Sequence, residues 1–506
     1  MNISMLLEMV AEGAGDRTVV GTRADGLDAT ELLRRAQRAA GLFRSAGVDH
    51  VAMIGLNSDA VPIALFGAGL AGLPFAPLNY RLTDEQLGAV LPQLVTALVI
   101  ADDDMVGRVG GIDGLTVMSR SEFTESVASG DEPDDLPFVD PDEVAILLFT
   151  SGTTGTPKAA VLRHRHLTSY ILGSVEYLAA EEDEAQLVSV PSYHIAGVSA
   201  ILSSLYSGRR IVYLPGFDPE SWVETVGTER VTQAMVVPTM LGRILDQAEA
   251  SGSRLDSLRH LSYGGGRMPV ETIERAMAML PDVNFVNAYG LTETSSTVAV
   301  LTPDDHREAA ASDDELIRRR LGSVGRPLPT LELEIRDPLG AVVGPNERGE
   351  IYVRGEQVAG EYRGRSVLTD DGWFPTNDAG HLDDDGFLYL EGRLDDVIVR
   401  GGENLSPGEI EDRLRAHESV TDVAVVGVPD DEWGEVPAAV VVLAPGSTAT
   451  EDDLREWVRT GLRSTREPAV ISFRGELPYN ETGKLLRRVI REDLRLETVP
   501  SIDPEQ

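Results

Sequence analysis

Short apolar runs alternate with helix-like segments through the first half of the chain. Each run has the length of one strand and is mostly apolar, as expected of strands whose two faces are both buried. Alternation of such strands with helices predicts doubly wound α/β sheets, with ligands at the carboxyl ends of the strands. The runs are VAMIGL (51–56), TALVIA (96–101), VAILLF (144–149), RIVYLP (210–215), AMVVP (234–238) and NFVNAYG (284–290).

The pattern changes after about residue 320. Closely spaced extended runs, LELEI, EIYVRG and FLYLEG, are separated by the turns DPLG and DDDG, which predicts antiparallel sheet in a small barrel-like subdomain. From Asp395 onward helices and strands alternate again, as in a compact α+β unit. We therefore expect a large N-terminal domain, residues 1–394, followed by a small C-terminal domain, residues 395–506.

Composition excludes several classes of function. The net charge of −39 opposes binding to nucleic acid or to an anionic membrane surface. The absence of cysteine excludes disulfides, thiolate metal sites and a thioester on the enzyme itself. No apolar run is long enough to cross a bilayer, and the N-terminus lacks the basic region of a signal peptide, so we expect a cytoplasmic protein.

The stretch TSGTTGTPK, residues 150–158, follows the apolar run 144–149 and precedes a predicted helix. Glycines let backbone amides approach an anion, hydroxyls add donors, and lysine adds a mobile charge, so the stretch predicts a phosphate-binding loop. It is not a Walker A loop, because Pro157 precedes Lys158 and Ala159 follows it. Among the 44 basic residues, only Lys158 and Lys484 are lysine.

This loop resembles the signature loop of the adenylate-forming superfamily, which includes acyl-CoA synthetases, luciferases and the adenylation domains of peptide synthetases. Further motifs follow in the order of that family, and the resemblance runs from Pro77 to Lys484. It implies an AMP-binding domain with a mobile C-terminal lid. The motifs are PSYHIAG (191–197), NAYGLTET (287–294), TNDAG around Asp378, EGRLDD around Arg393, RGGENLSPGEIE (400–411) and LPYNETGKLLR (477–487).

The resemblance implies an ATP site with bound Mg²⁺. Glu293 and Thr150 would hold the metal, Tyr289 would lie near adenine, and Asp378 would bind the ribose hydroxyls with Arg393 as its partner. A carboxylate near a phosphate-binding loop is what a hard cation bridging to phosphate requires. The implied ATP-binding residues are Thr150, Ser151, Gly152, Thr153, Thr154, Gly155, Lys158, Gly265, Asn287, Ala288, Tyr289, Gly290, Thr292, Asp378 and Arg393.

The implied reaction has two steps, with Lys484, Glu293 and His194 as catalytic residues. A carboxylate first attacks ATP to form an acyl-adenylate, and a thiol then takes the acyl group. Because the chain has no cysteine, the thiol must come from CoA or from a carrier protein. Between the steps the C-terminal domain would rotate about Asp395, and Gly401 and Gly402 would then line a tunnel for the pantetheine arm of CoA. An ordinary tight turn is the alternative interpretation of these two glycines.

The implied acyl pocket comprises Tyr193, His194, Ile195, Gly197, Gly264 and Gly266. Histidine at 194, where amino-acid-activating relatives place an aspartate nearby, favours a plain carboxylic acid: fatty, aryl or alicyclic. A purely structural role for His194 is the alternative. Arg267 beside the glycines would meet a second carboxylate on the substrate, or it is a surface or phosphate-facing arginine, which is the favoured interpretation. The chain departs from the usual pattern at Ala159 and Asn377, where the family usually has glycine.

The leading hypothesis is an acyl-CoA ligase that uses ATP, Mg²⁺, CoA and a small carboxylic acid. The nearest alternative is an acyl-AMP ligase that loads a phosphopantetheinyl carrier protein, although no insertion is evident between residues 330 and 400. A nucleotide-binding module without catalysis and a luciferase-like oxygenase are alternatives from other classes. The resemblance leaves a homodimer open and gives no reason to expect nucleic acid as a partner.

Overall fold

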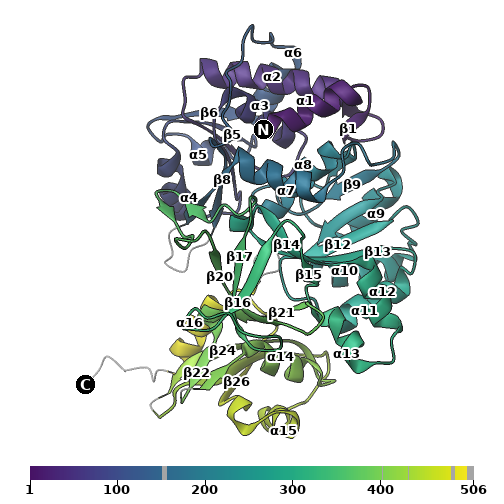
Figure 1. Ribbon diagram of the computed structural model, residues 1–506, viewed down its shortest axis with the longest axis vertical. Helices are drawn as coiled ribbons and strands as arrows, with labels where there is room; N and C mark the ends of the chain where they lie inside the picture. The colour runs from purple at the N-terminus through teal and green to yellow at the C-terminus, as the bar shows by residue number, and fades with distance from the viewer. Residues whose placement is uncertain (151–156, 402, 431, 480–484, 499–506) are drawn as a thin grey trace. The chain divides into compact units, whose positions relative to one another are not determined.

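The computed structural model describes residues 1–150, 157–401, 403–430, 432–479 and 485–498 (Figure 1). Its contacts divide the chain into two compact units. Unit 1 comprises Met1–Leu333 and Val353–Phe374, and unit 2 comprises Glu334–Tyr352 and Pro375–Gln506. The predicted boundary between residues 394 and 395 falls inside unit 2, and it stays a prediction.

Unit 1 contains an eight-stranded sheet in the order β19-β18-β8-β7-β4-β3-β5-β6. Strands β7, β4, β3, β5 and β6 are parallel, and β8, β18 and β19 continue the sheet in antiparallel fashion. The bounds are β3 (His50–Ile54), β4 (Phe75–Leu78), β5 (Ala97–Ala101), β6 (Leu115–Ser119), β7 (Val144–Thr150), β8 (Lys158–Arg163), β18 (Glu361–Tyr362) and β19 (Arg365–Ser366).

Both faces of this sheet are buried. Along β3, Val51 and Met53 belong to one apolar cluster, and Ala52 and Ile54 belong to another. Successive side chains on a strand point to opposite faces, so each face of the sheet supports its own core. This is the reason why the strands appear in the sequence as continuous apolar runs instead of alternating patterns.

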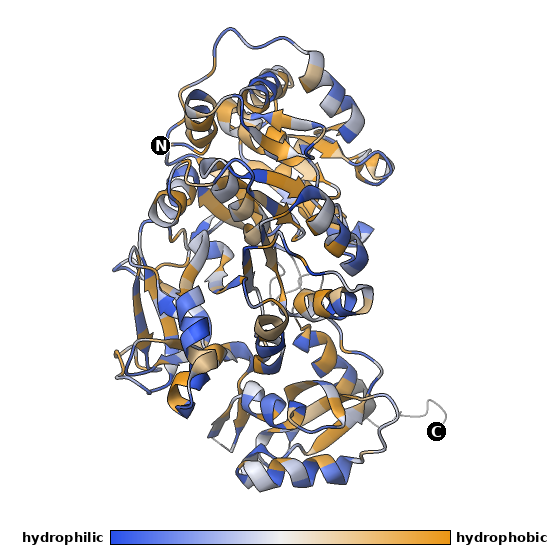
Figure 2. Cartoon of the chain, turned by 90° about the vertical axis from the view of Figure 1, so that its right-hand side faces the viewer, coloured by the Kyte–Doolittle hydropathy of each residue, from blue (hydrophilic) through white to orange (hydrophobic). Residues whose placement is uncertain are grey.

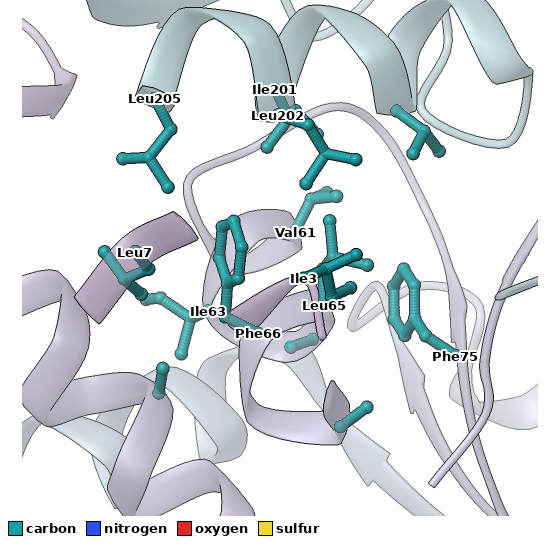
Figure 3. Packing of buried hydrophobic residues seen from close by; sticks show 14 of the residues in the cluster. Ile3, Leu7, Val61, Ile63, Leu65, Phe66, Phe75, Ile201, Leu202 and Leu205 are labelled. Atoms are coloured by element: carbon teal, nitrogen blue, oxygen red, sulfur yellow. The ribbon is translucent and has the colours of Figure 1, made fainter. Parts of the chain in front are cut away.

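The first of these cores forms around α3 (Ala60–Ala71), a helix in which every residue is buried. Figure 3 shows Ile201, Leu202 and Leu205 of α8 (Ile195–Tyr206) pointing toward Leu65 and Phe66 of α3. A helix that is apolar on all sides has to be covered on all sides, and α3 lies between the sheet and neighbouring helices.

A second sheet of unit 1 has nine strands in the order β15-β14-β13-β12-β11-β9-β10-β1-β2. The strands from β1 to β13 in this order are parallel, whereas β2, β14 and β15 are antiparallel additions at the two ends. The bounds are β1 (Thr18–Gly21), β2 (Gly26–Asp28), β9 (Ala185–Val188), β10 (Arg210–Tyr213), β11 (Gln233–Val236), β12 (His260–Gly264), β13 (Asn284–Leu291), β14 (Ser296–Leu301) and β15 (Arg326–Pro327).

All six predicted strands of the first half are present, but the predicted helix directly after Lys158 is wrong. Residues 158–163 form β8, which pairs antiparallel with β7 so that Thr150 faces Lys158. Ala159 and Val161 pack into one core and Leu162 into the opposite one, which is the period of a strand. A short apolar run does not distinguish strand from helix by itself, and the pairing with β7 decides. The helix begins only at His164.

Unit 2 contains a five-stranded sheet in the order β23-β22-β25-β24, with β26 paired to β25, and most of a four-stranded sheet in the order β16-β17-β20-β21. The extended runs predicted to form antiparallel sheet are β16, β17 and β21. The bounds are β16 (Glu332–Arg336), β17 (Gly349–Arg354), β20 (Phe374–Leu382), β21 (Leu388–Arg393), β22 (Ile398–Arg400), β23 (Glu403–Leu405), β24 (Val420–Asp430), β25 (Gly434–Leu443) and β26 (Val470–Phe473).

In Figure 2 the strands of the unit 1 sheets are mostly apolar, and the helices beside them carry both apolar and polar residues. Within the described residues, no helix is long and apolar enough to cross a membrane. The remaining helices are α1 (Ser4–Gly13), α2 (Ala29–Ser45), α4 (Asp84–Val90), α5 (Val106–Val109), α6 (Arg120–Ser129), α7 (His164–Ser174), α9 (Pro219–Glu229), α10 (Pro238–Ser251), α11 (Val270–Met279), α12 (Pro303–Ala311), α13 (Glu315–Arg318), α14 (Pro407–Arg415), α15 (Glu451–Gly461) and α16 (Arg487–Thr498).

Candidate nucleotide and acyl site

Three of the predicted motifs of unit 1 lie at one edge of the nine-stranded sheet. The parallel strands β9, β12 and β13 end at Val188, Gly264 and Leu291, and the motif residues follow or complete these ends. Gly264 lies directly beside Ala288 in the register of β12 and β13. Carboxyl ends of parallel strands meet at the same edge, where ligands bind in open α/β sheets. The fold therefore brings together the predicted acyl-pocket and adenine-binding segments.

Most of the motif glycines of unit 1 are required by close backbone packing. A Cβ atom on Gly197 would lie 2.5 Å from the Pro191 carbonyl oxygen, one on Gly264 2.3 Å from that of Ala288, and one on Gly290 1.8 Å from that of Ser296. Gly265 has a φ of +75°, which a side chain would strain. Gly265 and Gly266 are exposed, so their peptide groups are accessible to a ligand.

The predicted metal ligand Glu293 lies in the short 3-10 helix Thr292–Thr294 that follows β13. Its side chain is buried, and one carboxylate oxygen, Oε1, accepts a hydrogen bond from the Tyr362 hydroxyl. Its backbone carbonyl accepts hydrogen bonds from the N–H groups of Ala359 (2.8 Å) and Gly360 (3.1 Å). The segment from Ala359 to Tyr362 thus holds both ends of Glu293. The sequence motifs did not identify Tyr362.

Strand β18 also connects this segment to the predicted phosphate-binding loop. Tyr362 pairs with Ala160 on β8, and Glu361 accepts two hydrogen bonds from the Arg163 guanidinium, at 2.9 and 2.8 Å. These bonds raise the pKa of Arg163 and keep it charged. β8 begins at Lys158, whose side chain is exposed. The strand that follows the loop is therefore tied to the strand that holds Glu293.

Part of the predicted loop is outside the described residues. Thr150 ends β7, and its hydroxyl lies 3.4 Å from the Lys158 carbonyl oxygen. The structure thus places the two ends of the loop side by side. Ser151, Gly152, Thr153, Thr154 and Gly155 fall outside the described residues.

The loop that carries Tyr193 and His194 is anchored by Asn57, a residue that the sequence motifs missed. The Asn57 carbonyl oxygen accepts the backbone N–H of Ser192 (3.0 Å) and its hydroxyl (2.8 Å), and the Asn57 amide donates to the Val190 carbonyl (3.0 Å). Asn57 is buried, and both ends of its amide are paired with groups of one loop. A polar residue directly after the apolar run 51–56 was the available signal.

At the tip of this loop His194 precedes α8, which begins at Ile195. The His194 ring lies 4.7 Å from the Tyr193 ring, and Tyr193 meets Tyr80 edge-on at 6.1 Å. Tyr193 is buried and His194 is partly exposed. The arrangement is a small aromatic cluster at the same sheet edge as Gly264, which suits an apolar ligand more than a charged one.

Behind this edge a buried pair fixes the end of β12. The Nδ1 atom of His306 lies 2.8 Å from the Thr302 carbonyl oxygen, and Nε2 lies 2.8 Å from the Tyr263 hydroxyl. Because a carbonyl oxygen only accepts, Nδ1 carries the proton and Nε2 accepts from Tyr263. Burial lowers the pKa of His306 and raises the pKa of Tyr263, so both stay neutral. The predicted ATP-binding residue Asn287 donates to the Ser323 carbonyl at 3.0 Å.

In unit 2 the predicted ribose-binding residues are direct neighbours. Asp378 on β20 faces Arg393 on β21, and the Arg393 Nε lies 3.0 Å from the Asp378 Oδ1. Arg393 also donates to the Thr376 carbonyl (2.8 Å), and the Thr376 hydroxyl accepts the Asp378 N–H (3.1 Å). A carboxylate has two oxygens that accept hydrogen bonds, the kind of group that the predicted contact with ribose hydroxyls requires.

The C-terminal motifs of unit 2 are described in part. Gly401 has a φ of +57°, and a Cβ there would lie 2.8 Å from the Trp433 ring, so the position requires glycine. The Asp395 carboxylate accepts a hydrogen bond from the Asn377 amide at 2.8 Å. The predicted residues Gly402 and Lys484 fall outside the described residues.

The described residues suit Mg²⁺ bound together with a nucleotide. Glu293 offers a buried carboxylate and Thr150 a hydroxyl, which are the hard oxygen ligands that this ion prefers. Over the described residues, no three His, Asp or Glu side chains form a self-contained metal site. A metal held by one carboxylate needs oxygens from its substrate, as Mg²⁺ commonly does with phosphates.

Two family models match the chain. The model described as AMP-binding enzyme covers residues 7–363, and the model of the AMP-binding enzyme C-terminal domain covers residues 409–484. The chain belongs to the AMP-binding enzyme family. The first match contains Lys158, Glu293 and the aromatic loop, and the second ends at Lys484.

Curated relatives match this AMP-binding enzyme over nearly its whole length. It is 36% identical over 482 residues to a feruloyl-CoA synthase of Amycolatopsis sp., with 94% of this chain and 95% of the relative covered. It is 32% identical over 478 residues to the fatty acid–[acyl-carrier-protein] ligase ScoC of Streptomyces coeruleorubidus, covering 91% and 90%.

Among solved structures, the o-succinylbenzoate CoA synthetase of Bacillus subtilis, in complex with its acyl-adenylate intermediate, has a TM-score of 0.83 with this AMP-binding enzyme. The two chains are 27% identical, and the alignment covers 96% of this chain and 97% of that chain. The α/β architecture with a smaller C-terminal part, predicted from the sequence, is therefore confirmed.

Proposed function

We propose that this AMP-binding enzyme is an ATP-dependent ligase that joins a carboxylic acid to CoA through an acyl-adenylate. The observation that carries the proposal is the full-length similarity to a CoA synthetase solved with its acyl-adenylate. The similar feruloyl-CoA synthase supports the same reaction. The fold supplies a suitable site, because the predicted acyl and adenine segments meet at one sheet edge.

In the first step a carboxylate oxygen of the acid attacks the α-phosphorus of ATP. The bond from that phosphorus to the bridging oxygen breaks, and pyrophosphate leaves with the bonding electrons. We assign Lys158 and the loop that precedes it to the phosphates, and Lys484 to the charge that develops between carboxylate and α-phosphate. Glu293, oriented by Tyr362, would hold Mg²⁺, which when bound supplies positive charge opposite the phosphate oxygens.

In the second step the CoA thiol, as its thiolate, attacks the acyl carbon of the adenylate. The bond from that carbon to the phosphate oxygen breaks, giving the thioester and AMP. We assign Asp378 and Arg393 to the ribose in both steps, because their ion pair is formed inside unit 2. Rotation about Asp395 would exchange Lys484 for the Gly401 segment between the steps.

We further propose an acid with an aromatic body. The support is the cluster of Tyr80, Tyr193 and His194 beside the glycine-lined edge, where aromatic rings favour offset or edge-on contacts. Feruloyl-CoA synthase and o-succinylbenzoate CoA synthetase, to which this chain is similar, are both named for aromatic acids. A fatty acid is the alternative, supported by the similarity to ScoC.

The test is a mass-spectrometric screen of the purified protein with ATP and Mg²⁺. Ferulate, 2-succinylbenzoate, a medium-chain fatty acid and an amino acid are each supplied with CoA, with a phosphopantetheinylated carrier protein, or with neither. We expect acyl-CoA and AMP from an aromatic acid. If the adenylate persists with CoA but is consumed by the carrier protein, the acceptor is the carrier protein and not CoA. If none of the acids gives an adenylate, the ligase proposal is overturned.

A second test examines the role proposed for Lys484. The Lys484→Ala variant should lose adenylate formation far more than thioester formation from a supplied adenylate. The matched control is Arg488→Ala, which removes an exposed cation four residues further along the chain. Equal loss in both half-reactions would contradict the rotation about Asp395.

A further inference from the structure

Asn377 occupies a backbone position that normally favours glycine. Its φ is +60°, in the left-handed region, and it directly precedes the ribose-binding residue Asp378. Asparagine tolerates this conformation better than most residues with a side chain. The related family pattern usually has glycine here, so this chain has added a side chain at a position where the turn itself does not require one.

The added amide has a specific partner. The Asn377 Nδ2 donates to the Asp395 Oδ2 at 2.8 Å, inside unit 2. The turn does not depend on this bond, because the Asn377 backbone N–H already donates to Glu350 Oε1 (3.0 Å) and the Asp378 N–H donates to the Thr376 hydroxyl (3.1 Å). The side chain of Asn377 therefore contributes one extra link, from the ribose turn to Asp395.

The residue after Asp395, Asp396, lies close to two arginines of the last helix, α16. Asp396 lies 3.7 Å from the Arg487 Nε and 3.5 Å from the Arg491 Nη2. Both arginines belong to α16, which begins three residues after Lys484. Arg487 is also bound by the Glu411 carboxylate, with its Nη2 2.9 Å from Oε2. Two adjacent aspartates thus connect the ribose turn on one side with the helix that follows Lys484 on the other.

We propose that Asn377 is a positioning residue that restrains the backbone at Asp395 and thereby sets the ratio of adenylate formation to thioester formation. This inference rests on the proposed function, in which Asp395 is the point of rotation and Lys484 acts in the first step. A backbone change at Asp395 that moves its carboxylate away from Asn377 breaks this hydrogen bond, so the bond opposes such a change. While it is intact, the ribose turn, Asp395 and α16 form one connected set.

The test compares two asparagines that differ in position. Asn377→Gly removes the amide and keeps the left-handed backbone accessible. Asn346→Gly is the matched control, because Asn346 also lies in unit 2, has a φ of +64° and donates its Nδ2 to an aspartate, Asp384, at 3.0 Å. Both substitutions add the same backbone freedom to the unfolded chain. They differ in whether the lost bond reaches Asp395.

Two half-reactions are measured on the full-length proteins: acid-dependent pyrophosphate release, and thioester formation from supplied acyl-adenylate and CoA. In Asn377→Gly we expect the ratio of the first rate to the second to change about three- to tenfold, as expected for the loss of one hydrogen bond. In Asn346→Gly the ratio should stay within about twofold. An unchanged ratio in Asn377→Gly, or the same change in both variants, would overturn the inference.

An exchange of the two partners tests the bond itself. Asn377→Asp alone places two carboxylates together and should change the ratio in the same direction. Combining it with Asp395→Asn restores a donor and an acceptor, and the ratio should return toward that of the wild type. Failure of the double variant to recover would show that the contact is not the cause.

A readout without turnover separates this inference from the proposed function. Hydrogen–deuterium exchange of peptides covering residues 394–400 should be faster in Asn377→Gly than in the wild type and unchanged in Asn346→Gly. Equal exchange in all three proteins would overturn the restraint even if the enzyme is a ligase. Conversely, if the wild-type protein forms no acyl-adenylate, the proposed function is overturned. The exchange measurement still tests whether Asn377 restrains the backbone at Asp395.

Discussion

In unit 1 the glycine motifs of the candidate site are held by backbone packed against backbone, whereas in unit 2 the predicted ribose-binding residues are held by side-chain hydrogen bonds and an ion pair. Gly264 and Gly290 leave no room for a Cβ atom beside the facing strand. Asp378 and Arg393 instead pair through partly exposed side chains. Close contacts between paired backbones cannot be adjusted one at a time, whereas side-chain hydrogen bonds can be gained or lost singly. We therefore expect substitutions of the closely packed glycines of unit 1 to affect folding, and substitutions of single hydrogen-bonding side chains to affect binding.

The largest expected effect is on folding of unit 1. Gly290→Ala places a methyl group 1.8 Å from the Ser296 carbonyl oxygen, so the backbone of β13 or β14 has to shift to accommodate it. We expect a loss of at least about 4 kcal/mol in the free energy of unfolding, measured by urea denaturation. The control is Gly242→Ala in α10, where a Cβ meets nothing within 4 Å. Equal stability of the two variants would break the comparison.

The next effect is an acid sensitivity of unit 1. His166 is buried, its Nδ1 accepts the Arg163 N–H at 3.3 Å, and burial lowers its pKa from 6.5 to about 4. Above pH 6.5 the ring is neutral in both the folded and the unfolded states. As the pH falls from 6.5 toward 4, only the unfolded state takes up the proton, so the folded state loses up to about 2 kcal/mol.

His166→Asn keeps an acceptor and removes this titration. Denaturation at pH 7 and pH 4.5 should show a smaller loss of stability in the variant than in the wild type. The same pH dependence in both proteins would mean that burial of His166 does not cause the acid sensitivity.

A smaller effect is expected in unit 2. Arg393→Met removes the ion pair with Asp378 and should weaken AMP binding about tenfold, with little change in stability. Calorimetric titration with AMP measures it. The control is Arg348→Met, which breaks a comparable ion pair with Glu391 (2.9 Å) in the same unit. Equal weakening in both variants would mean that the Asp378–Arg393 pair has no special part in ribose binding.

The smallest expected effect separates backbone contacts from side-chain bonds within unit 1 itself, because it concerns a single side-chain hydrogen bond there. Tyr362→Phe removes the hydroxyl that donates to Glu293 and keeps the ring. We expect the Mg²⁺ concentration for half-maximal ATP binding to rise about fivefold, with unfolding unaffected. Tyr170→Phe, which loses a 3.2 Å contact with the Thr297 hydroxyl, is the control. If the Mg²⁺ dependence of ATP binding is unchanged in Tyr362→Phe, the Tyr362 hydroxyl does not position Glu293 for the metal.

Much of this protein was predictable from local sequence. The apolar runs predicted six strands of unit 1, because a strand buried on both faces needs a continuous apolar stretch whatever lies beside it. The order of the motifs predicted the family, and the motif residues Asp378 and Arg393 are cross-strand neighbours as that resemblance implied. These features depend on residues close together in the chain or on short patterns.

Only the tertiary structure decided what pairs with what. Residues 158–163 form a strand because β7 is available to pair with them. Asn57 anchors a loop 135 residues away, and Tyr362 reaches Glu293 across 69 residues. Asn377 was noticed in the sequence as a departure from glycine, but its bond to Asp395 depends on the register of β20 and β21. Local periodicity specifies which face of an element is apolar, whereas such partners are set by how distant elements pack.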